Sequence, residues 1–284
     1  MAIRKGEKIK MAAESKLFYL VELIDDESAE IRDEIASQLN NYGLSLEEDL
    51  KNLSRELHPD KMKIISPILS KNRRRWLGEN WNLWFDSENA FEKIETALDL
   101  IARYHYGSFS TPMLSKMLDI LTEEFKNKIP YGDEFDLSNF LFQEKGIKGA
   151  KDNYYNPFNS NAVFAIKEKK GLPITLSLIF ILIGNRLGFD IRGCNLPGHF
   201  LSKIMIDEEI ILIDCFEGGR IIYENEINEV LDYPVESVFA ALHNDPTAEQ
   251  MISRVVNNLI NAYSFINDDG NSVFFSELLN QIKK

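Results

Sequence analysis

The sequence has few cysteines, few basic residues and no long apolar run. In a chain of 284 residues, Cys194 and Cys215 do not provide a disulfide framework, and neither has the spacing of a zinc site. Lysine and arginine number 32 against 45 aspartates and glutamates, so the net charge is −13. This charge argues against binding to nucleic acid or to an anionic membrane, because phosphate contact needs a clustered basic face.

The apolar segments are also too short to cross a membrane. The longest of them, from Ile174 to Ile183, contains Thr175 and Ser177. The first residues, MAIRKGEKIKMAAESK, lack the apolar region of a signal peptide. We therefore expect a cytoplasmic protein without membrane contact, and we expect no metal and no other cofactor.

The first part of the chain has helical periodicity. Apolar residues recur at helical spacing on both sides of an acidic turn: Leu17, Leu20, Val21 and Ile24 before it, and Ile31, Ile35 and Leu39 after it. Two helices joined in this way resemble one HEAT-type repeat, which must pack on further helices to bury both of its faces. We assign residues 1–85 to this HEAT-like helical segment.

The rest of the chain mixes strands with helices. A strongly apolar helix is expected from Pro173 to Leu187, where Gly188 ends it. Strand-like composition follows at residues 191–196, 200–206, 210–215 and 220–223. We expect an α+β domain over residues 86–235. Residues 236–284 are then expected to form a helical hairpin of the kind found in TPR arrays.

Two of the expected strands carry a histidine and an aspartate. His199 immediately precedes Phe200, where the second strand is expected to begin, and Asp214 is the second-to-last residue of the third. If the register of the hairpin brings them together, Asp214 accepts a hydrogen bond from the imidazole and selects its tautomer. The alternative interpretation is a buried structural pair that persisted after catalysis was lost.

Several separated motifs occur in a recognisable order. They are Asn156-Pro157 and Asn159-Ser160; Gly171, Pro173, Ile174, Leu176 and Ser177; Arg186-Leu187-Gly188; Leu196-Pro197-Gly198-His199-Phe200; and Asp214, Phe216, Gly218 and Gly219. The stretch SRVVNNLINAYSFINDD follows them. Together they resemble the SirB1 family, a branch of the transglutaminase-like superfamily, over roughly residues 91–284.

The resemblance implies a core in which a helix packs on an antiparallel sheet. In active relatives a cysteine at the helix N-terminus attacks the substrate, a strand histidine takes its proton and an aspartate orients that histidine. His199 and Asp214 match the last two roles. The position of the cysteine falls at Pro173, which has no reactive side chain, and the SirB1 branch generally has Pro-Ile there.

Other nucleophiles are therefore considered. Cys194 precedes His199 by five residues, an odd separation that predicts opposite faces of an extended strand unless a bulge at the turn around Gly198 intervenes. Thr175 and Ser177 lie near the start of the apolar helix. Either hydroxyl could be activated by His199, or could instead bond to the backbone of its own helix.

The loop before the helix offers candidate binding residues. Asn159 and Ser160 could line a cleft together with Pro173 and bind a peptide or an amide group. They could equally be turn residues that satisfy the backbone of the loop.

The sequence favours a noncatalytic or cryptic transglutaminase-like protein that acts through protein interaction or regulation. The helical segments at both ends are of a type used to bind protein partners, and the acidic charge favours a basic partner or peptide. The alternative is a hydrolase or acyltransferase acting on peptide or amide bonds. In that case His199 is the general base, Asp214 orients it, and a hydroxyl, a thiol or water is the nucleophile.

Overall fold

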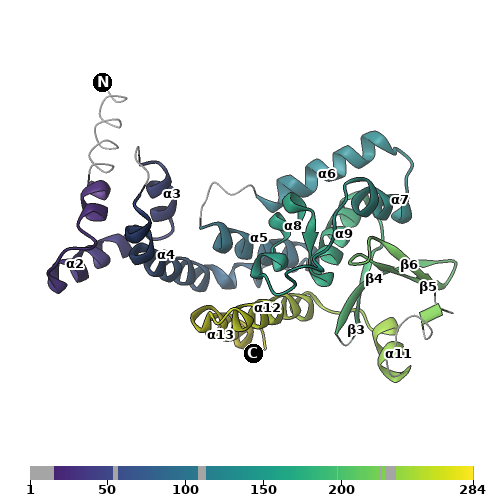
Figure 1. The fold of residues 1–284 in the computed structure, drawn as a ribbon. Coiled ribbons are helices and arrows are strands. Elements are labelled where there is room, and N and C mark those ends of the chain that lie inside the picture. Colours follow the sequence, from purple (N-terminus) through teal and green to yellow (C-terminus); the bar gives the residue numbers. More distant parts are fainter. Residues whose placement is uncertain are drawn as a thin grey trace. The chain divides into compact units, whose positions relative to one another are not determined.

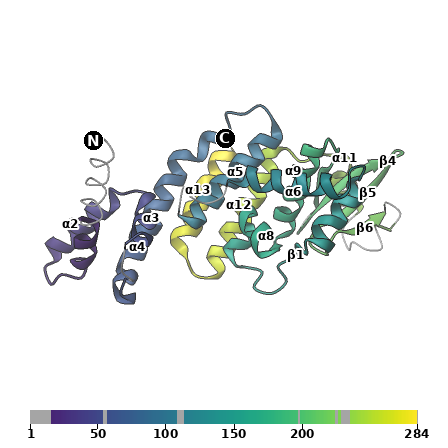
Figure 2. The same cartoon turned by 90° about the horizontal axis from the view of Figure 1, so that it is seen from above.

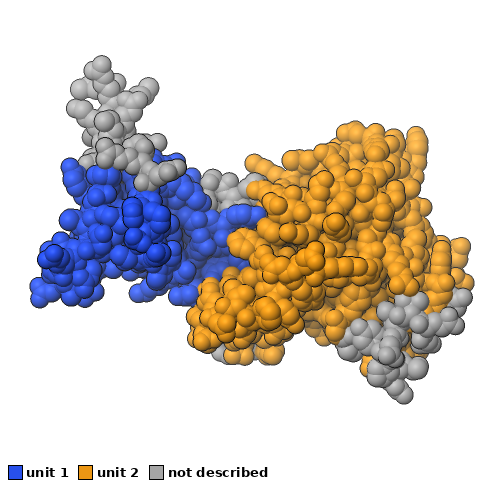
Figure 3. Space-filling model, viewed as in Figure 1, with its two compact units in different colours: residues 1–80, 103–111 blue, residues 81–102, 112–284 orange. Residues whose placement is uncertain are grey.

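A computed structural model describes residues 16–53, 57–107, 113–196, 198–223, 226–227 and 235–283 (Figure 1). Contacts within the chain divide it into two units. The first comprises residues 1–80 and 103–111, and the second comprises residues 81–102 and 112–284 (Figure 3). Pro197, a member of one predicted motif, lies outside the described residues.

The first unit is helical in the part that the structure describes. After a helical segment at residues 16–22 it contains α2 (Ala29–Asn40), α3 (Ser45–Lys51) and α4 (Pro59–Asn80). Their buried apolar residues form one cluster: Leu17, Leu20, Val21, Ile24, Ile35, Leu39, Leu46, Leu50, Ile65 and Ile68. Both predicted stripes contribute to this cluster, although Ile31 of the second stripe is exposed.

The second unit begins with helices, of which α6 and α7 pack on a buried central helix. They are η1 (Trp81–Trp84), α5 (Ala90–Tyr106, of which residues up to Ala102 belong here), α6 (Leu114–Lys128), α7 (Glu134–Ser138) and the π-helix η2 (Asn139–Glu144). The central helix is α9 (Pro173–Leu187), and its residues from Pro173 to Gly184 are all buried. It packs against α6 and against strand β4 (Figure 2).

The ends of α9 follow from local chemistry. Pro173 occupies the first turn, where its missing N–H costs nothing. Gly188 ends the helix with a φ of +82°, which favours glycine. Arg186, in the last turn, donates to Glu95 at 2.7 Å and to Asp119 at 2.8 Å. These two bonds hold the end of α9 to α5 and α6.

Small elements connect α7 and η2 to α9. They are β1 (Lys148–Gly149), the 3-10 helix η3 (Pro157–Ser160), α8 (Ala162–Glu168) and β2 (Lys170–Gly171). β1 and β2 pair in parallel as a short ribbon, with Lys148 opposite Lys170. The amide of Leu172 donates to the carbonyl of Asn159 at 3.0 Å, so η3 lies beside the start of α9.

A four-stranded antiparallel sheet follows α9, with strand order β3-β4-β5-β6. The strands are β3 (Arg192–Leu196), β4 (His199–Ile206), β5 (Glu209–Asp214) and β6 (Arg220–Tyr223). Asp207 and Glu208 both have positive φ in the tight turn between β4 and β5. All four strands were expected from composition, within a residue or two at each end.

Helices complete the second unit. α11 (Val235–His243) packs on one face of the sheet, where a cluster contains Cys194, Leu196, Leu201, Leu212, Ala241 and Leu242. α12 (Ala248–Phe265) begins at a capping box made by Thr247 and Gln250, and it packs against α13 (Asp269–Ile282). Within the described ranges, no helix has the length and apolar character needed to cross a membrane.

Candidate functional site

The predicted histidine and aspartate lie side by side at one end of β4 and β5, the two central strands of the sheet. The register pairs Ser202 with Ile213, and its continuation places Leu201 opposite Asp214. His199 lies two residues before Leu201, so it shares the face of Leu201 and is a diagonal neighbour of Asp214. Nε2 of His199 lies 3.0 Å from Oδ2 of Asp214.

The other carboxylate oxygen of Asp214 organises the turn that follows β5. Oδ1 accepts the backbone N–H groups of Phe216 and Glu217, each at 3.1 Å. Asp214 is only 5% exposed, so these three hydrogen bonds replace the water that burial removes. The carboxylate therefore accepts hydrogen bonds both from the backbone of the turn and from the imidazole.

The imidazole has one nitrogen available. Because the carboxylate accepts from Nε2–H, the neutral ring keeps Nδ1 as an acceptor. Nδ1 forms no hydrogen bond with any described residue, and the His199 side chain is 19% exposed. A ligand or a water molecule could therefore bond to Nδ1.

The start of α9 holds no nucleophile at the expected position. Pro173 is the first residue of the helix, and Leu172 is its N-cap, which has no side-chain oxygen to offer. Neither residue can form a covalent intermediate.

The argument that Cys194 and His199 lie on opposite faces is wrong. They lie on two different strands, and the register pairs Leu196 with His199 and Cys194 with Leu201. Paired residues share a face, so Cys194 and His199 point to the same side. Cys194 is nevertheless buried, with its thiol 3.6 Å from the carbonyl of Ala241, and burial raises the pKa of this thiol to about 11.

Cys215 and Ser177 belong to a buried polar cluster on the other face. The sulfur of Cys215 lies 3.6 Å from the hydroxyl of Ser202, and Ser177 of α9 also faces this sulfur. Burial raises the pKa of Cys215 to about 12. Ser202 alternates with Leu201 along β4, so this cluster and the imidazole lie on opposite sides of the sheet.

The remaining hydroxyls near α9 are equally inaccessible. Thr175, Ser177 and Ser160 are fully buried, and none of their hydroxyls bonds to a nitrogen or oxygen of a described residue. Asn159 is also buried, and its amide donates to the carbonyl of Asn153 at 2.8 Å and to that of Tyr154 at 3.1 Å. These bonds stabilise the loop, as a turn residue does.

Sequence reasoning did not single out Arg254 of α12. Its guanidinium donates to the side chain of Asn195 and, at 2.8 Å, to the carbonyl of Leu196. It also lies over the ring of Phe200, 5.7 Å from the centroid. Leu196 pairs with His199, so Arg254 holds the turn that presents the imidazole. One available signal was that Arg254 is the only arginine after Arg220 in the sequence.

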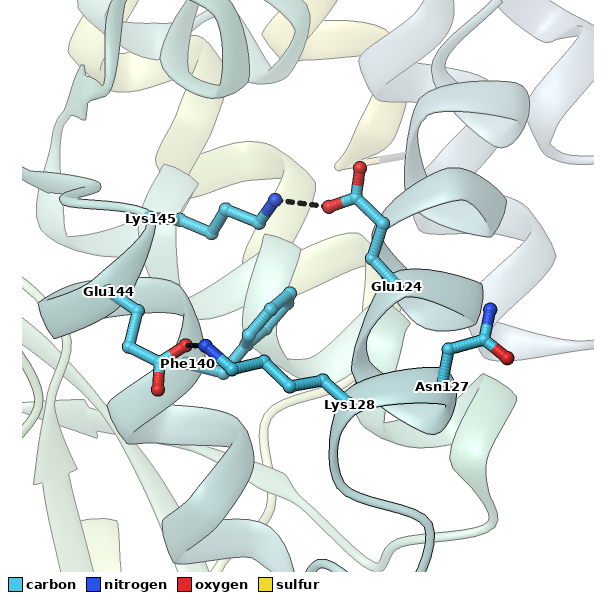
Figure 4. A pocket seen from close by; sticks show the side chains of 6 residues that line it. All are labelled: Glu124, Asn127, Lys128, Phe140, Glu144 and Lys145. Carbon is cyan, nitrogen blue, oxygen red and sulfur yellow. Dashed lines mark hydrogen bonds and ion pairs between the residues drawn. The ribbon is translucent and has the colours of Figure 1, made fainter.

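A cavity of about 520 Å³ lies away from these residues, between α6 and η2 (Figure 4). Two ion pairs cross it, Lys145 with Glu124 and Lys128 with Glu144. Its lining holds as many positive as negative side chains and none of the candidate nucleophiles. We assign no chemistry to it.

Comparisons with known proteins place this arrangement in a family. The family model described as the transglutaminase-like superfamily matches residues 113–257, which is half of the chain. A UPF0162 protein of Xylella fastidiosa strain 9a5c is 29% identical over 185 residues, covering 61% of this chain and 66% of that protein. A UPF0162 protein of Vibrio cholerae is 26% identical over 110 residues, or 38% of this chain and 37% of that protein.

A eukaryotic relative shares a smaller part. F-box only protein 21 of Mus musculus is 27% identical over 128 residues, covering 42% of this chain and 20% of that protein. The matches thus span about two thirds of the Xylella relative and a fifth of the mouse protein. No solved structure matches the chain. The family model covers half of the chain, including the strands that carry His199 and Asp214. This chain therefore belongs to the transglutaminase-like superfamily.

Proposed function

We propose that this protein is a noncatalytic member of the superfamily that binds a protein or peptide partner. One observation carries the proposal: His199 and Asp214 are bonded to each other, but no candidate nucleophile is accessible to them. With pKa values near 11 and 12, each thiol is ionised in fewer than about one molecule in a thousand at neutral pH. The motifs around Pro173 favour the SirB1 branch.

The helical segments supply surfaces suited to this role. In our proposal the HEAT-like first unit and the TPR-like pair α12 and α13 contact the partner, because helical arrays of these types present extended binding surfaces. The partly exposed imidazole then binds a group of the partner rather than activating a nucleophile.

Labelling with activity probes tests the proposal. The protein is treated with a fluorophosphonate, which reports activated hydroxyls, and with iodoacetamide, which reports thiolates. Wild type and His199→Ala are compared in the folded state, with Phe239→Ala, an exposed ring on α11, as the control variant. We expect no labelling that depends on His199. Labelling that disappears only in His199→Ala would overturn the proposal.

A second candidate function uses water as the nucleophile. It is supported by Nδ1 of His199, which accepts no hydrogen bond from a described residue. In this function Nδ1 is the general base that takes a proton from the attacking water. The step would be hydrolysis of an amide, releasing an amine or ammonia and leaving a carboxylate. Ammonia release from a glutamine-containing peptide, measured for wild type and His199→Ala, distinguishes the two functions. Release that requires His199 would favour the hydrolase.

A further inference from the structure

The exposed face of α12 carries amide side chains where an exposed helix face usually carries charges. Residues at helical spacing form this surface, which we call the amide face: Gln250, Arg254, Asn257, Asn258, Asn261 and Phe265. All six are exposed or partly exposed. Only Glu249 and Arg254 are charged among the 18 residues of α12, whereas the chain's charged share of 27% would give about five.

Helix stability does not explain the asparagines of the amide face. Asparagine is a poorer helix former than alanine, lysine or glutamate, because its side chain competes for nearby backbone groups. Asn258 and Asn261 form no hydrogen bond with a described residue. Asn257 donates only to the carbonyl of Ser253 in its own helix, at 2.8 Å. These side chains therefore keep donors and acceptors for water or for a ligand.

A cavity of about 460 Å³ lies at one end of the amide face, between α12 and the ends of β3 and α13. Arg254 donates to the side chain of Asn195 in β3, so a further amide lines this cavity. Glu249, which also lines it, is paired with Lys93 at 2.7 Å. Lys283 lines it too and forms no ion pair with a described residue. This end of the amide face is therefore positively charged.

Exposed aromatic rings lie at the other end. Phe265, the last residue of α12, stacks on Tyr155 with centroids 4.4 Å apart, and Tyr155 contacts Tyr154 at 5.4 Å. Phe265 is 64% exposed, Tyr155 42% and Tyr154 37%. Arg254 and Phe265 are separated by about three helical turns, so they lie on the same side of α12. The cavity and the rings therefore follow each other along one helix face.

Primary amides match the backbone of an extended peptide. Each amide side chain both donates and accepts hydrogen bonds, as each peptide group does. An extended chain presents equivalent peptide groups on one side about every 6.7 Å, and one turn of an α-helix rises about 5.4 Å. From Gln250 to Phe265 the amide face is about 22 Å long, which is the span of about seven extended residues.

We propose that the amide face binds an extended segment of a partner protein. The backbone of the segment bonds to Asn257 and Asn261, and an aromatic or aliphatic side chain packs on Phe265 and Tyr155. An acidic side chain lies near Lys283, because the cavity at that end is positive in a chain that is otherwise acidic. The inference rests on the proposed function, since it names the surface and the partner class of that binding protein.

Selection of peptides tests this surface. Dodecapeptides displayed on phage are selected on the immobilised full chain, and those that are enriched are synthesised with fluorescein and titrated by anisotropy. The amide variant is Asn257→Ala/Asn261→Ala, which keeps the helix because alanine is the better helix former. Its control is Asn82→Ala/Asn127→Ala, which removes two exposed asparagines from η1 and α6.

Ring and charge variants complete the set. Phe265→Ala removes a ring of the proposed surface, and its control Phe239→Ala removes a ring of similar exposure from α11. Lys283→Glu reverses the charge at the cavity, and its control Lys116→Glu makes the same change on α6.

We expect the dissociation constant of the selected peptides to rise about tenfold or more in the amide variant and severalfold in Phe265→Ala and Lys283→Glu, with little change in the controls. Methylation of alternate backbone nitrogens of the peptide should weaken binding in one of the two alternating sets only, because only one set faces the amides. No enrichment on the wild-type chain, or equal affinities for the amide variant and its control, would overturn the surface assignment.

Two further outcomes separate the remaining ideas. Selected peptides that are basic, and that bind Lys283→Glu as tightly as Lys116→Glu, would overturn the choice of an acidic segment. Probe labelling that depends on His199, together with peptide binding that still requires Asn257 and Asn261, would overturn the proposed function and not this surface. The two failures are therefore distinguishable.

Discussion

Removing the carboxylate of Asp214 is expected to destabilise the second unit strongly. In Asp214→Ala three hydrogen bonds are lost: one from His199 at 3.0 Å, and those from Phe216 and Glu217 at 3.1 Å each. A hydrogen bond to a charged group contributes about 1.5–3 kcal/mol. Part of this loss is offset in the variant, because water reaches the exposed side of the turn and bonds to the freed N–H groups. We therefore expect a loss of about 3 kcal/mol in the free energy of unfolding.

Asp214→Asn is the matched variant. The amide oxygen still accepts the two backbone N–H groups, and the amide can donate to the other tautomer of the imidazole, so the expected loss is about 1 kcal/mol. Urea unfolding followed by circular dichroism measures both losses. Hydrogen exchange at the amides of Phe216 and Glu217 measures the turn directly and should accelerate only in Asp214→Ala.

The result that refutes this reasoning is specific. If Asp214→Ala unfolds within about 0.5 kcal/mol of wild type and the exchange of both amides is unchanged, the carboxylate does not organise the turn. Its pairing with His199 would then have to be explained by a function in which the imidazole itself takes part.

Three further predictions follow from other parts of the molecule. Burial lowers the pKa of His105 to about 3 in the folded protein, whereas in the unfolded chain the imidazole has its ordinary pKa of about 6.5. The first unit should therefore lose stability by up to about 1.4 kcal/mol per pH unit as the pH falls from 6.5 towards 3, and His105→Phe should flatten this dependence in urea titrations. Cys194 and Cys215 should react with iodoacetamide at neutral pH only when urea is added, and fast labelling of the folded protein would contradict their burial. Lys170→Glu should raise the free energy of unfolding by about 0.5 kcal/mol, because an attractive pair with Lys148 replaces a repulsive one, and a lower melting temperature would contradict this.

The sequence predicts the elements of the site well because their signals are local. Pro173 and Gly188 mark the ends of α9 through their own backbone chemistry. Alternating apolar residues with a short polar turn at Asp207 and Glu208 predict β4 and β5. That His199 and Asp214 lie close together follows from the same hairpin. Their role in binding or catalysis stays a prediction.

The error about Cys194 has a simple physical origin. Counting residues predicts a face only within one continuous strand. The chain reverses near Gly198, whose φ is +72°, so Cys194 and His199 are compared across a hairpin rather than along a strand. The gap between the strands expected at residues 191–196 and 200–206 already indicated a reversal, so the count along a single strand did not apply.

The sequence by itself determined that Pro173 cannot act as a nucleophile, because a side chain without a reactive group stays unreactive in any fold. It also determined the order of helix and strands, because periodicity and turn chemistry act over a few residues. Only the tertiary structure decided that both thiols are buried and that Tyr155 stacks on Phe265. It also decided that Arg254 donates a hydrogen bond to the carbonyl of Leu196, just before His199. Burial and contacts of this kind depend on how distant segments pack, and packing is a property of the whole chain rather than of any one stretch.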